Sequence, residues 1–369
     1  MSFEYLAANV RHSATSFDAH LVENNFFEGW YFKIVRKDGV NCFFIPGIYH
    51  SPLAKSHSHA FIMFWVSGMS SANYYRYRTD AYSFDTQKTI KVGTSKFSLA
   101  GAYLDLRAAD LWIPTPQELD EYKSLTPYPT IPQQNLDYSA NFTFTNITEF
   151  PSRMFESGVM GAFGFIPFLS CYHGIASLHH EVTGYVESDA KTIEFKTNTT
   201  GYIEKDWGRE FPNIGYIWIQ SHTFDSEDTT FLLSLASVPV PLKMGSTPGF
   251  LVILKIGKII YNFSTYAFAK FVYVYVDTIA GGLSVSFQLR KKGLRLTGTC
   301  CTTKFSTSVH LRAPMNGQMK THVEEWNGAE VKLKLEETSR GNHVVIFEGI
   351  GTNAGLEAIG DIQWLKNRI

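Results

Sequence analysis

The chain has 369 residues with 33 basic and 34 acidic side chains, which gives a formal net charge of −1. This balance provides no basic surface that could follow a phosphate backbone, so we expect no nucleic acid partner and no electrostatic attachment to anionic membranes. The length suffices for two domains, and an aromatic content of 15%, mostly Phe and Tyr, favours β-sheet.

Signals for export, membrane insertion and disulfide formation are not found in the sequence. It contains no stretch of the ~20 apolar residues that a membrane-spanning helix needs, and its first residues lack the pattern of a secretory signal. The four cysteines (Cys42, Cys171, Cys300 and Cys301) form no C-x-x-C pair, which predicts neither a zinc site nor a disulfide framework. We therefore expect a cytoplasmic protein without an integral membrane segment, compatible with peripheral lipid association.

In chain order, the first half has the pattern of strands joined by turns. Residues 26–35 are aromatic and β-branched, Asp38-Gly39 is a strong hairpin signal, and residues 41–49 form the returning strand. Five of the 14 prolines fall within residues 113–134. This density excludes a long regular element and predicts a surface loop.

The second half repeats this style, with short strands and tight turns that predict a barrel or a sandwich. The expected strands are residues 230–238, 250–256, 258–263, 271–276, 283–290, 294–300, 308–313, 329–336 and 343–351. Each half also opens with a Gly/Trp pair before an aromatic strand, which suggests two similar barrels. We therefore predict an all-β fold with two domains, residues 1–192 with the proline-rich loop 113–134, and residues 193–369.

Two carboxylates and an ammonium lie next to one another in residues 201–208, between aromatic side chains. On a strand, Glu204 and Asp206 would face one side of the sheet and Lys205 the other. Two carboxylates on one face push their pKa values apart, so that one can stay protonated and act as an acid. The spacing alone favours a plainer alternative, a solvated turn or a structural bridge between Glu204 and Arg209.

Histidines gather between Cys171 and Glu181. Adjacent histidines on a strand point to opposite faces, and the spacing differs from the helical zinc motif H-E-x-x-H, so we predict no metal site. His180 is a candidate base or proton shuttle. The sequence has no phosphate-binding loop, dinucleotide fingerprint or G-x-S-x-G motif, which argues against kinases, nicotinamide enzymes and serine hydrolases and predicts no cofactor.

Several segments resemble the tocopherol cyclase family, in the same order along the chain. They are residues 27–33, 164–168, 171–174, His180 with Gly184, 201–208, Phe211-Pro212 and Trp218 with Gln220, followed by weaker matches at residues 311–314 with Gly317 and at 355–357. The Glu-Lys-Asp-Trp-Gly block within residues 201–208 is the most specific of them. The resemblance implies two lipocalin-like β-barrel or sandwich domains around an apolar pocket and a more distant relation to carotenoid 1,2-hydratase-like proteins.

The resemblance also implies a chemistry. Plant members of the family close a chromanol ring on a prenylated quinol without a redox cofactor: a proton adds to an alkene, and the phenol oxygen captures the cation. The implied partner is therefore a hydrophobic small molecule, isoprenoid or quinol-like. Such a reaction needs a carboxylic acid in apolar surroundings, aromatic faces around the cation and exclusion of water.

On this basis we expect Asp206 to donate the proton and Glu204 or His180 to accept the phenol proton. Lys205 would orient a ring oxygen. The full set of expected substrate-binding residues is Tyr202, Lys205, Trp207, Trp218, Gln220, Tyr172, His173 and Trp30.

Two departures from the family pattern leave alternatives open. The matching region begins too near Met1 for a plastid transit peptide, and residues 168–170 read Phe-Leu-Ser where the resemblance predicts a carboxylate. The alternatives are a related hydratase or isomerase, a lipocalin-like carrier without catalysis, and a structural protein. An enzyme predicts a carboxylate inside the pocket, a carrier predicts acids only at its rim, and a structural protein predicts a filled barrel.

Overall fold

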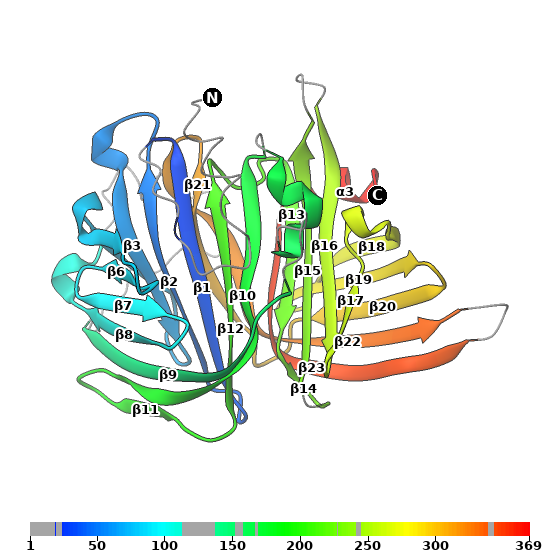
Figure 1. Cartoon of the computed structure of the whole chain (residues 1–369), viewed down its shortest axis with the longest axis horizontal. Helices are drawn as coiled ribbons and strands as arrows, with labels where there is room; N and C mark the ends of the chain where they lie inside the picture. Colours follow the sequence, from blue (N-terminus) through cyan, green and yellow to red (C-terminus); the bar gives the residue numbers. More distant parts are fainter. Residues whose placement is uncertain are drawn as a thin grey trace. The chain divides into compact units, whose positions relative to one another are not determined.

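The computed structural model describes Ala19 and residues 24–112, 137–151, 158–166, 169–226, 228–240, 245–338 and 343–369. These residues form two antiparallel β-sheets with only short helices, which confirms the predicted all-β fold (Figure 1). The predicted proline-rich loop at residues 113–134 lies outside the described residues. Within the described part of the chain, no helix has the length and apolar character of a membrane span.

The first sheet has 12 strands in the order β4-β3-β2-β1-β12-β10-β9-β8-β7-β6-β5, with β11 paired to β10. They are β1 (Phe26–Arg36), β2 (Asn41–His50), β3 (His59–Val66), β4 (Asn73–Tyr77), β5 (Tyr82–Phe84), β6 (Ile90–Val92), β7 (Ser95–Ser98), β8 (Gly101–Leu106), β9 (Tyr138–Thr148), β10 (Cys171–Glu187), β11 (Thr192–Phe195) and β12 (Thr199–Gly208). Most neighbours in this sheet follow one another in sequence. Strand β12 is the exception, because it lies between β1 and β10 and so joins the first strands of the chain to the later ones.

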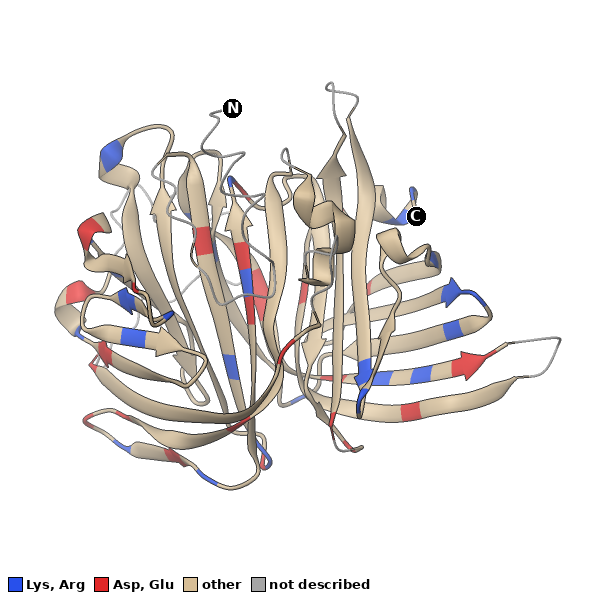
Figure 2. Ribbon diagram, in the orientation of Figure 1, with Lys and Arg blue, Asp and Glu red and all other residues tan. Residues whose placement is uncertain are grey.

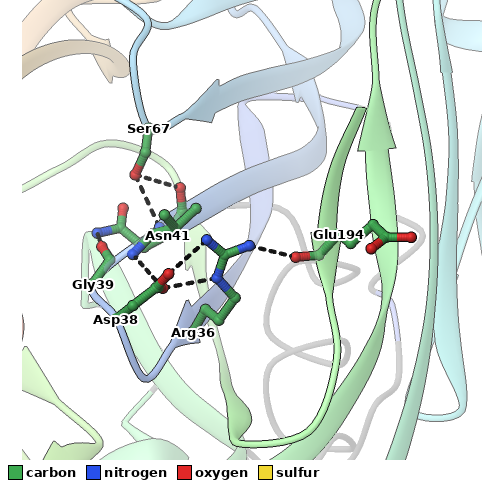
Figure 3. Close-up of polar contacts among 7 residues, drawn as sticks. Arg36, Asp38, Gly39, Asn41, Ser67 and Glu194 are labelled. Atoms are coloured by element: carbon green, nitrogen blue, oxygen red, sulfur yellow. Dashed lines mark hydrogen bonds and ion pairs between the residues drawn. The ribbon is translucent and has the colours of Figure 1, made fainter. Parts of the chain in front are cut away.

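The hairpin that joins β1 and β2 has the turn that its Asp-Gly pair predicts, since the glycine after Asp38 has a φ of 93°. The Arg36 guanidinium donates two hydrogen bonds to the Asp38 carboxylate, each 2.7 Å long, and a third of 2.6 Å to the Glu194 carbonyl oxygen (Figure 3). Beside the turn, the backbone N–H of Asn41 donates a hydrogen bond of 2.9 Å to Ser67 Oγ. These contacts connect the turn to the strands on either side of it.

The second sheet has 11 strands in the order β17-β16-β15-β13-β23-β22-β20-β19-β18, with β14 paired to β23 and β21 to β22. They are β13 (Gly215–Ser221), β14 (Thr223–Phe224), β15 (Thr229–Pro239), β16 (Ser246–Ile256), β17 (Ile259–Asn262), β18 (Lys270–Ile279), β19 (Gly282–Lys291), β20 (Leu294–Cys301), β21 (Thr307–Met315), β22 (Gln318–Glu337) and β23 (Val344–Gly360). The 3-10 helices span Lys55–His57, Thr79–Ala81, Ala108–Asp110, Gly158–Phe165 and Thr265–Ala267, and the chain ends in helix α3 (Ile362–Lys366).

Contacts within the chain divide it into two compact units. The first contains Met1–Val159, Cys171–Phe211 and Val309–His322, and the second contains Met160–Ser170, Pro212–Ser308 and Val323–Ile369. The predicted domain boundary after residue 192 falls inside the first unit. The division of the chain into two independently folding domains at this boundary stays a prediction.

Each unit has its own apolar core. In the first unit, Phe32 stacks on Phe44 with ring centroids 4.9 Å apart, and Phe44 stacks on Phe142 at 5.9 Å. In the second unit, Phe231 and Phe287 are stacked at 5.7 Å. We call the face of the first sheet that bears Phe32 the core face and the opposite one the far face.

Acidic and basic positions lie next to one another on strands such as β12 and β22 (Figure 2).

Replacing Phe44 with alanine should destabilise the first unit by about 3–5 kcal/mol, because a buried ring is removed from the stack and a cavity is left. Urea unfolding followed by tryptophan fluorescence measures the change. The control is Tyr103→Ala, at a side chain that is 43% exposed, and it should leave the unfolding midpoint nearly unchanged. Equal effects of the two substitutions would contradict this description of the core.

Candidate acid–base site

Strand β12 carries charged side chains on both of its faces. Because side chains alternate along a strand, Tyr202, Glu204 and Asp206 lie on the far face, whereas Lys205 and Trp207 lie on the core face. This is the separation of the carboxylates from the ammonium that the sequence pattern predicted. Glu204 is only 4% exposed within a continuous strand, so the alternative of a solvated turn is wrong.

On the far face, His173 of β10 lies between two carboxylates. Its Nδ1 is 2.9 Å from Asp206 Oδ1, and its Nε2 is 3.4 Å from Glu204 Oε2. The Tyr202 hydroxyl donates a hydrogen bond of 2.7 Å to Glu204 Oε2. We call these four residues the acid–base cluster. Three of them are buried, whereas the side chain of Asp206 is 29% exposed and is therefore the member that a ligand can reach.

The charges of the cluster set its protonation. Burial by itself lowers the pKa of His173, but the negative charges of Glu204 and Asp206 and the hydrogen bond to Asp206 outweigh burial and raise that pKa to about 9. Burial and the neighbouring Glu204 raise the pKa of Tyr202 well above its usual value. At neutral pH, His173 is therefore an imidazolium and Tyr202 a neutral hydrogen-bond donor.

The donor atoms of His173, Glu204 and Asp206 lie within 4.8 Å of one another, and their types could hold a divalent cation. The two carboxylates, however, contact different nitrogens of the same ring. A metal would have to displace the ring proton and draw three donors to one side of the imidazole. The arrangement therefore fits an imidazolium that bridges two carboxylates better than a metal centre.

A second charged group lies behind the acid–base cluster, on the core face. Lys205 Nζ is 3.2 Å from Glu28 Oε1, and the two side chains are 1% and 0% exposed. The ammonium also lies over the rings of Trp30 and Trp207, 4.5 Å and 4.6 Å from their centroids, and Tyr172 stacks on Trp207 at 5.5 Å. Four of the expected substrate-binding residues therefore belong to the packing of the core face. Trp30 is fully buried, as its position predicted.

The expected proton acceptor His180 also lies away from the cluster. It pairs with Gly201, which puts it on the core face, and its ring is 4.6 Å from that of Phe144. Its Nδ1 is 2.9 Å from Ser177 Oγ. Burial, and secondarily the neighbouring His179, lowers the pKa of His180 to about 3, so it is neutral. The structure does not bring His180 to Glu204 or Asp206.

The remaining two predicted residues, Trp218 and Gln220, lie on β13 in the second unit. The Trp218 ring covers Gly355 of β23, and Gln220 Nε2 is 3.2 Å from His222 Nδ1. Both side chains are buried there. They are not members of the acid–base cluster.

The sequence patterns did not identify an aromatic row that lies on the far face beside the cluster. Tyr31 of β1 is the direct cross-strand neighbour of Glu204. Its ring stacks on Phe43 of β2 at 5.6 Å, and Phe43 stacks on Trp65 of β3 at 5.7 Å. The alternation along each strand is visible in the sequence. Which strands are neighbours is not, and without that order these three rings could not be connected to Glu204.

Removing either partner of the buried pair on the core face should be costly. Glu28→Gln or Lys205→Met alone should lower the free energy of unfolding by about 3–5 kcal/mol, because each leaves a buried charge without its partner. The double variant should recover much of this loss. Urea unfolding of all four proteins gives the coupling energy.

The control for this cycle is the surface pair Arg78–Asp80, whose side chains are 87% and 65% exposed. Arg78→Met should leave stability nearly unchanged. Additive effects of the two buried substitutions would contradict the pairing of Glu28 with Lys205.

The raised pKa of His173 predicts a pH-dependent stability. The folded pKa of about 9 exceeds the usual 6.5, so the folded state binds the proton more tightly than the unfolded state. The stabilisation, about 3 kcal/mol in size, is complete below pH 6.5 and is lost as the pH rises through 9. Comparing urea unfolding of wild type and His173→Gln from pH 6 to 10 should show the difference, whereas the exposed His343→Gln should follow wild type. An imidazole resonance of His173 that titrates near 6.5 would contradict this account.

Residues 24–360 match the family model described as tocopherol cyclase-like. No curated protein sequence gives a significant match.

Solved structures align with nearly the whole chain, but at low similarity. An AttH-type protein from Nitrosomonas europaea is 13% identical over 93% of this chain and 94% of that chain, with a TM-score of 0.45. CghA is 11% identical over 94% and 92%, with a TM-score of 0.47. Kievitone hydratase from Nectria haematococca is 8% identical over 96% and 92%, with a TM-score of 0.43. These likenesses are too weak to carry an argument. The family match covers most of the 369 residues, and the chain therefore belongs to the tocopherol cyclase-like family.

Proposed function

We propose that the protein is a cofactor-independent enzyme that protonates a carbon–carbon double bond of a hydrophobic, isoprenoid or quinol-like substrate and guides an oxygen of the same molecule onto the resulting cation. The observation that carries this proposal is the His173 imidazolium held between two carboxylates, one of which is reachable. Membership of the tocopherol cyclase-like family supports a cyclase or hydratase type of chemistry.

Asp206 is the proposed proton donor. It shares one dissociable proton with His173, because the pair can exist as carboxylate and imidazolium or as carboxylic acid and neutral imidazole. In the second form, Asp206 can give its proton to the alkene carbon. The new C–H bond forms from the π electrons, which leaves a tertiary cation on the other alkene carbon.

Glu204 is the proposed acceptor of the phenol proton. As the phenol oxygen bonds to the cation, its proton passes to the Glu204 carboxylate. Proton exchange among Glu204, His173 and Asp206 then returns one proton to Asp206 before the next turnover. The cycle consumes and releases one proton inside the cluster, so the reaction is an isomerisation without a co-reactant. The position of Glu204 on the same face as Asp206, with His180 on the other face, favours Glu204 for this role.

The aromatic row Tyr31–Phe43–Trp65 supplies the surroundings that a cation needs. Aromatic faces stabilise positive charge without forming a bond to it. The three rings are buried, which supports a site from which bulk water is excluded. A site that admits water would instead give a hydrated product, so the cyclase and hydratase alternatives differ in the oxygen that captures the cation.

The carrier and structural alternatives receive less support. A carrier predicts acids only at the rim, whereas Glu204 is 4% exposed. The core face of the first unit is packed with phenylalanine rings, as a filled barrel would be. The charged residues of the acid–base cluster lie on the opposite face, which a purely structural role does not require.

A turnover assay tests the proposal. The purified protein is incubated with prenylated quinols, and the products are followed by mass spectrometry. Asp206→Asn and His173→Gln should each lower turnover at least about 100-fold, while Asp80→Asn, at an exposed carboxylate, should not. A product of unchanged mass indicates cyclisation, and a gain of one water indicates hydration. Binding without conversion, or full activity of Asp206→Asn, would refute the proposal.

A further inference from the structure

A row of residues crosses the far face next to the acid–base cluster. His173, Asp206, Gly29, Gly47 and Phe61 are successive cross-strand neighbours on β10, β12, β1, β2 and β3. Direct neighbours in such a row have their side chains on the same face. The two glycines have none. The Phe61 ring covers Gly47, so the row lacks a side chain only above Gly29, between the Asp206 carboxylate and the Phe61 ring.

The two glycines differ in why they are there. A Cβ atom on Gly47 would overlap the Glu28 carbonyl oxygen and the Phe61 ring, so packing requires glycine at that position. A Cβ atom on Gly29 would lie 3.4 Å from Ile45 Cγ2 and 3.8 Å from Phe61 Cζ, which is ordinary van der Waals contact. The backbone of Gly29 is also outside the left-handed region. The fold therefore tolerates alanine at residue 29, and glycine there serves another purpose.

Solvent exposure points to that purpose. Gly29 and its neighbour Asp206 are both partly exposed. The residues around them on the same face are buried, with Phe27 at 3%, Tyr31 at 8% and Phe61 at 2% exposed. The surface that solvent can reach thus enters the far face at Gly29, directly beside the carboxylate.

We propose that the space above Gly29 is the subsite for the flat unsaturated segment of the substrate, and that Gly29 determines how wide that segment can be. The backbone of Gly29 forms the bottom of this subsite. Ile45 and Phe61 lie at its sides, and the Asp206 carboxylate lies beside it on the neighbouring strand. Such a slot accepts an aromatic ring or an alkene and excludes branched groups. The inference rests on the proposed function in that Asp206 is the proton donor.

Binding of the neutral aromatic probe N-phenyl-1-naphthylamine, followed by its fluorescence, tests the subsite without turnover. Gly29→Ala should weaken binding at least about tenfold, because a methyl group fills the slot. Ile45→Ala removes the nearest side-chain atoms, so the double variant Gly29→Ala/Ile45→Ala should return to within about threefold of wild type. Val345→Ala, at a strand residue of the second unit that is 48% exposed, is the control and should bind as wild type does.

The double variant separates a blocked slot from a damaged fold. If Gly29→Ala binds the probe like wild type, or if the double variant binds weakly while its thermal unfolding matches that of wild type, the proposed subsite is wrong. The outcomes are also distinct from those of the turnover assay. If Gly29→Ala loses probe binding and the double variant recovers it, but no substrate is converted, the subsite stands and the proposed enzyme activity is refuted. If substrate is converted and Gly29→Ala does not affect the conversion, the enzyme activity stands and the subsite is refuted.

Discussion

The insertion of β12 between β1 and β10 is the constraint on which the other features of the first unit depend. Strands β1 and β10 come from segments far apart in the chain, and only β12 hydrogen-bonds to both. Its register sets His173 against Asp206 on one side and Tyr31 against Glu204 on the other. A shift by one residue would exchange the two faces of the strand and bring the ammonium to the far face in place of the carboxylates.

Strand β12 accommodates three consecutive charges, two of them buried, because the sheet separates them onto its two faces. Lys205 is neutralised by Glu28 between tryptophan rings on the core face, and the two carboxylates share the His173 imidazolium on the far face. On each face, a partner from a neighbouring strand offsets the free-energy cost of removing the charge from water. The two groups differ in access: the pair on the core face is closed, whereas Asp206 is partly exposed. That difference is what distinguishes a structural ion pair from a group that can exchange a proton with a ligand.

The cluster combines features that an acid–base enzyme for apolar substrates needs. In the proposed reaction, the imidazolium stores a proton, the carboxylate beside Gly29 delivers it, and the carboxylate beside Tyr31 accepts one from the substrate. The stacked rings of Tyr31, Phe43 and Trp65 continue from the cluster along the same face. The position of the cluster on this face, away from the packed interior of the unit, differs from the picture of a ligand held within a barrel.

The sequence alone determined the all-β character, the turn at Asp38, the burial of Trp30 and the opposite directions of Lys205 and its two carboxylate neighbours. These depend on local composition and on the twofold alternation of a strand, which a linear pattern contains. The sequence pattern favoured His180 over His173 as a catalytic group and assigned Lys205 to substrate binding. Both expectations lacked the strand order, because spacing along the chain does not show which residue of a neighbouring strand lies beside a given side chain. Only the tertiary structure decided that His173 bridges the carboxylates and that Tyr31 and Gly29 adjoin them. The physical reason is that strand order and register are set by pairing between distant segments and by burial of one face, and these are properties of the folded sheet.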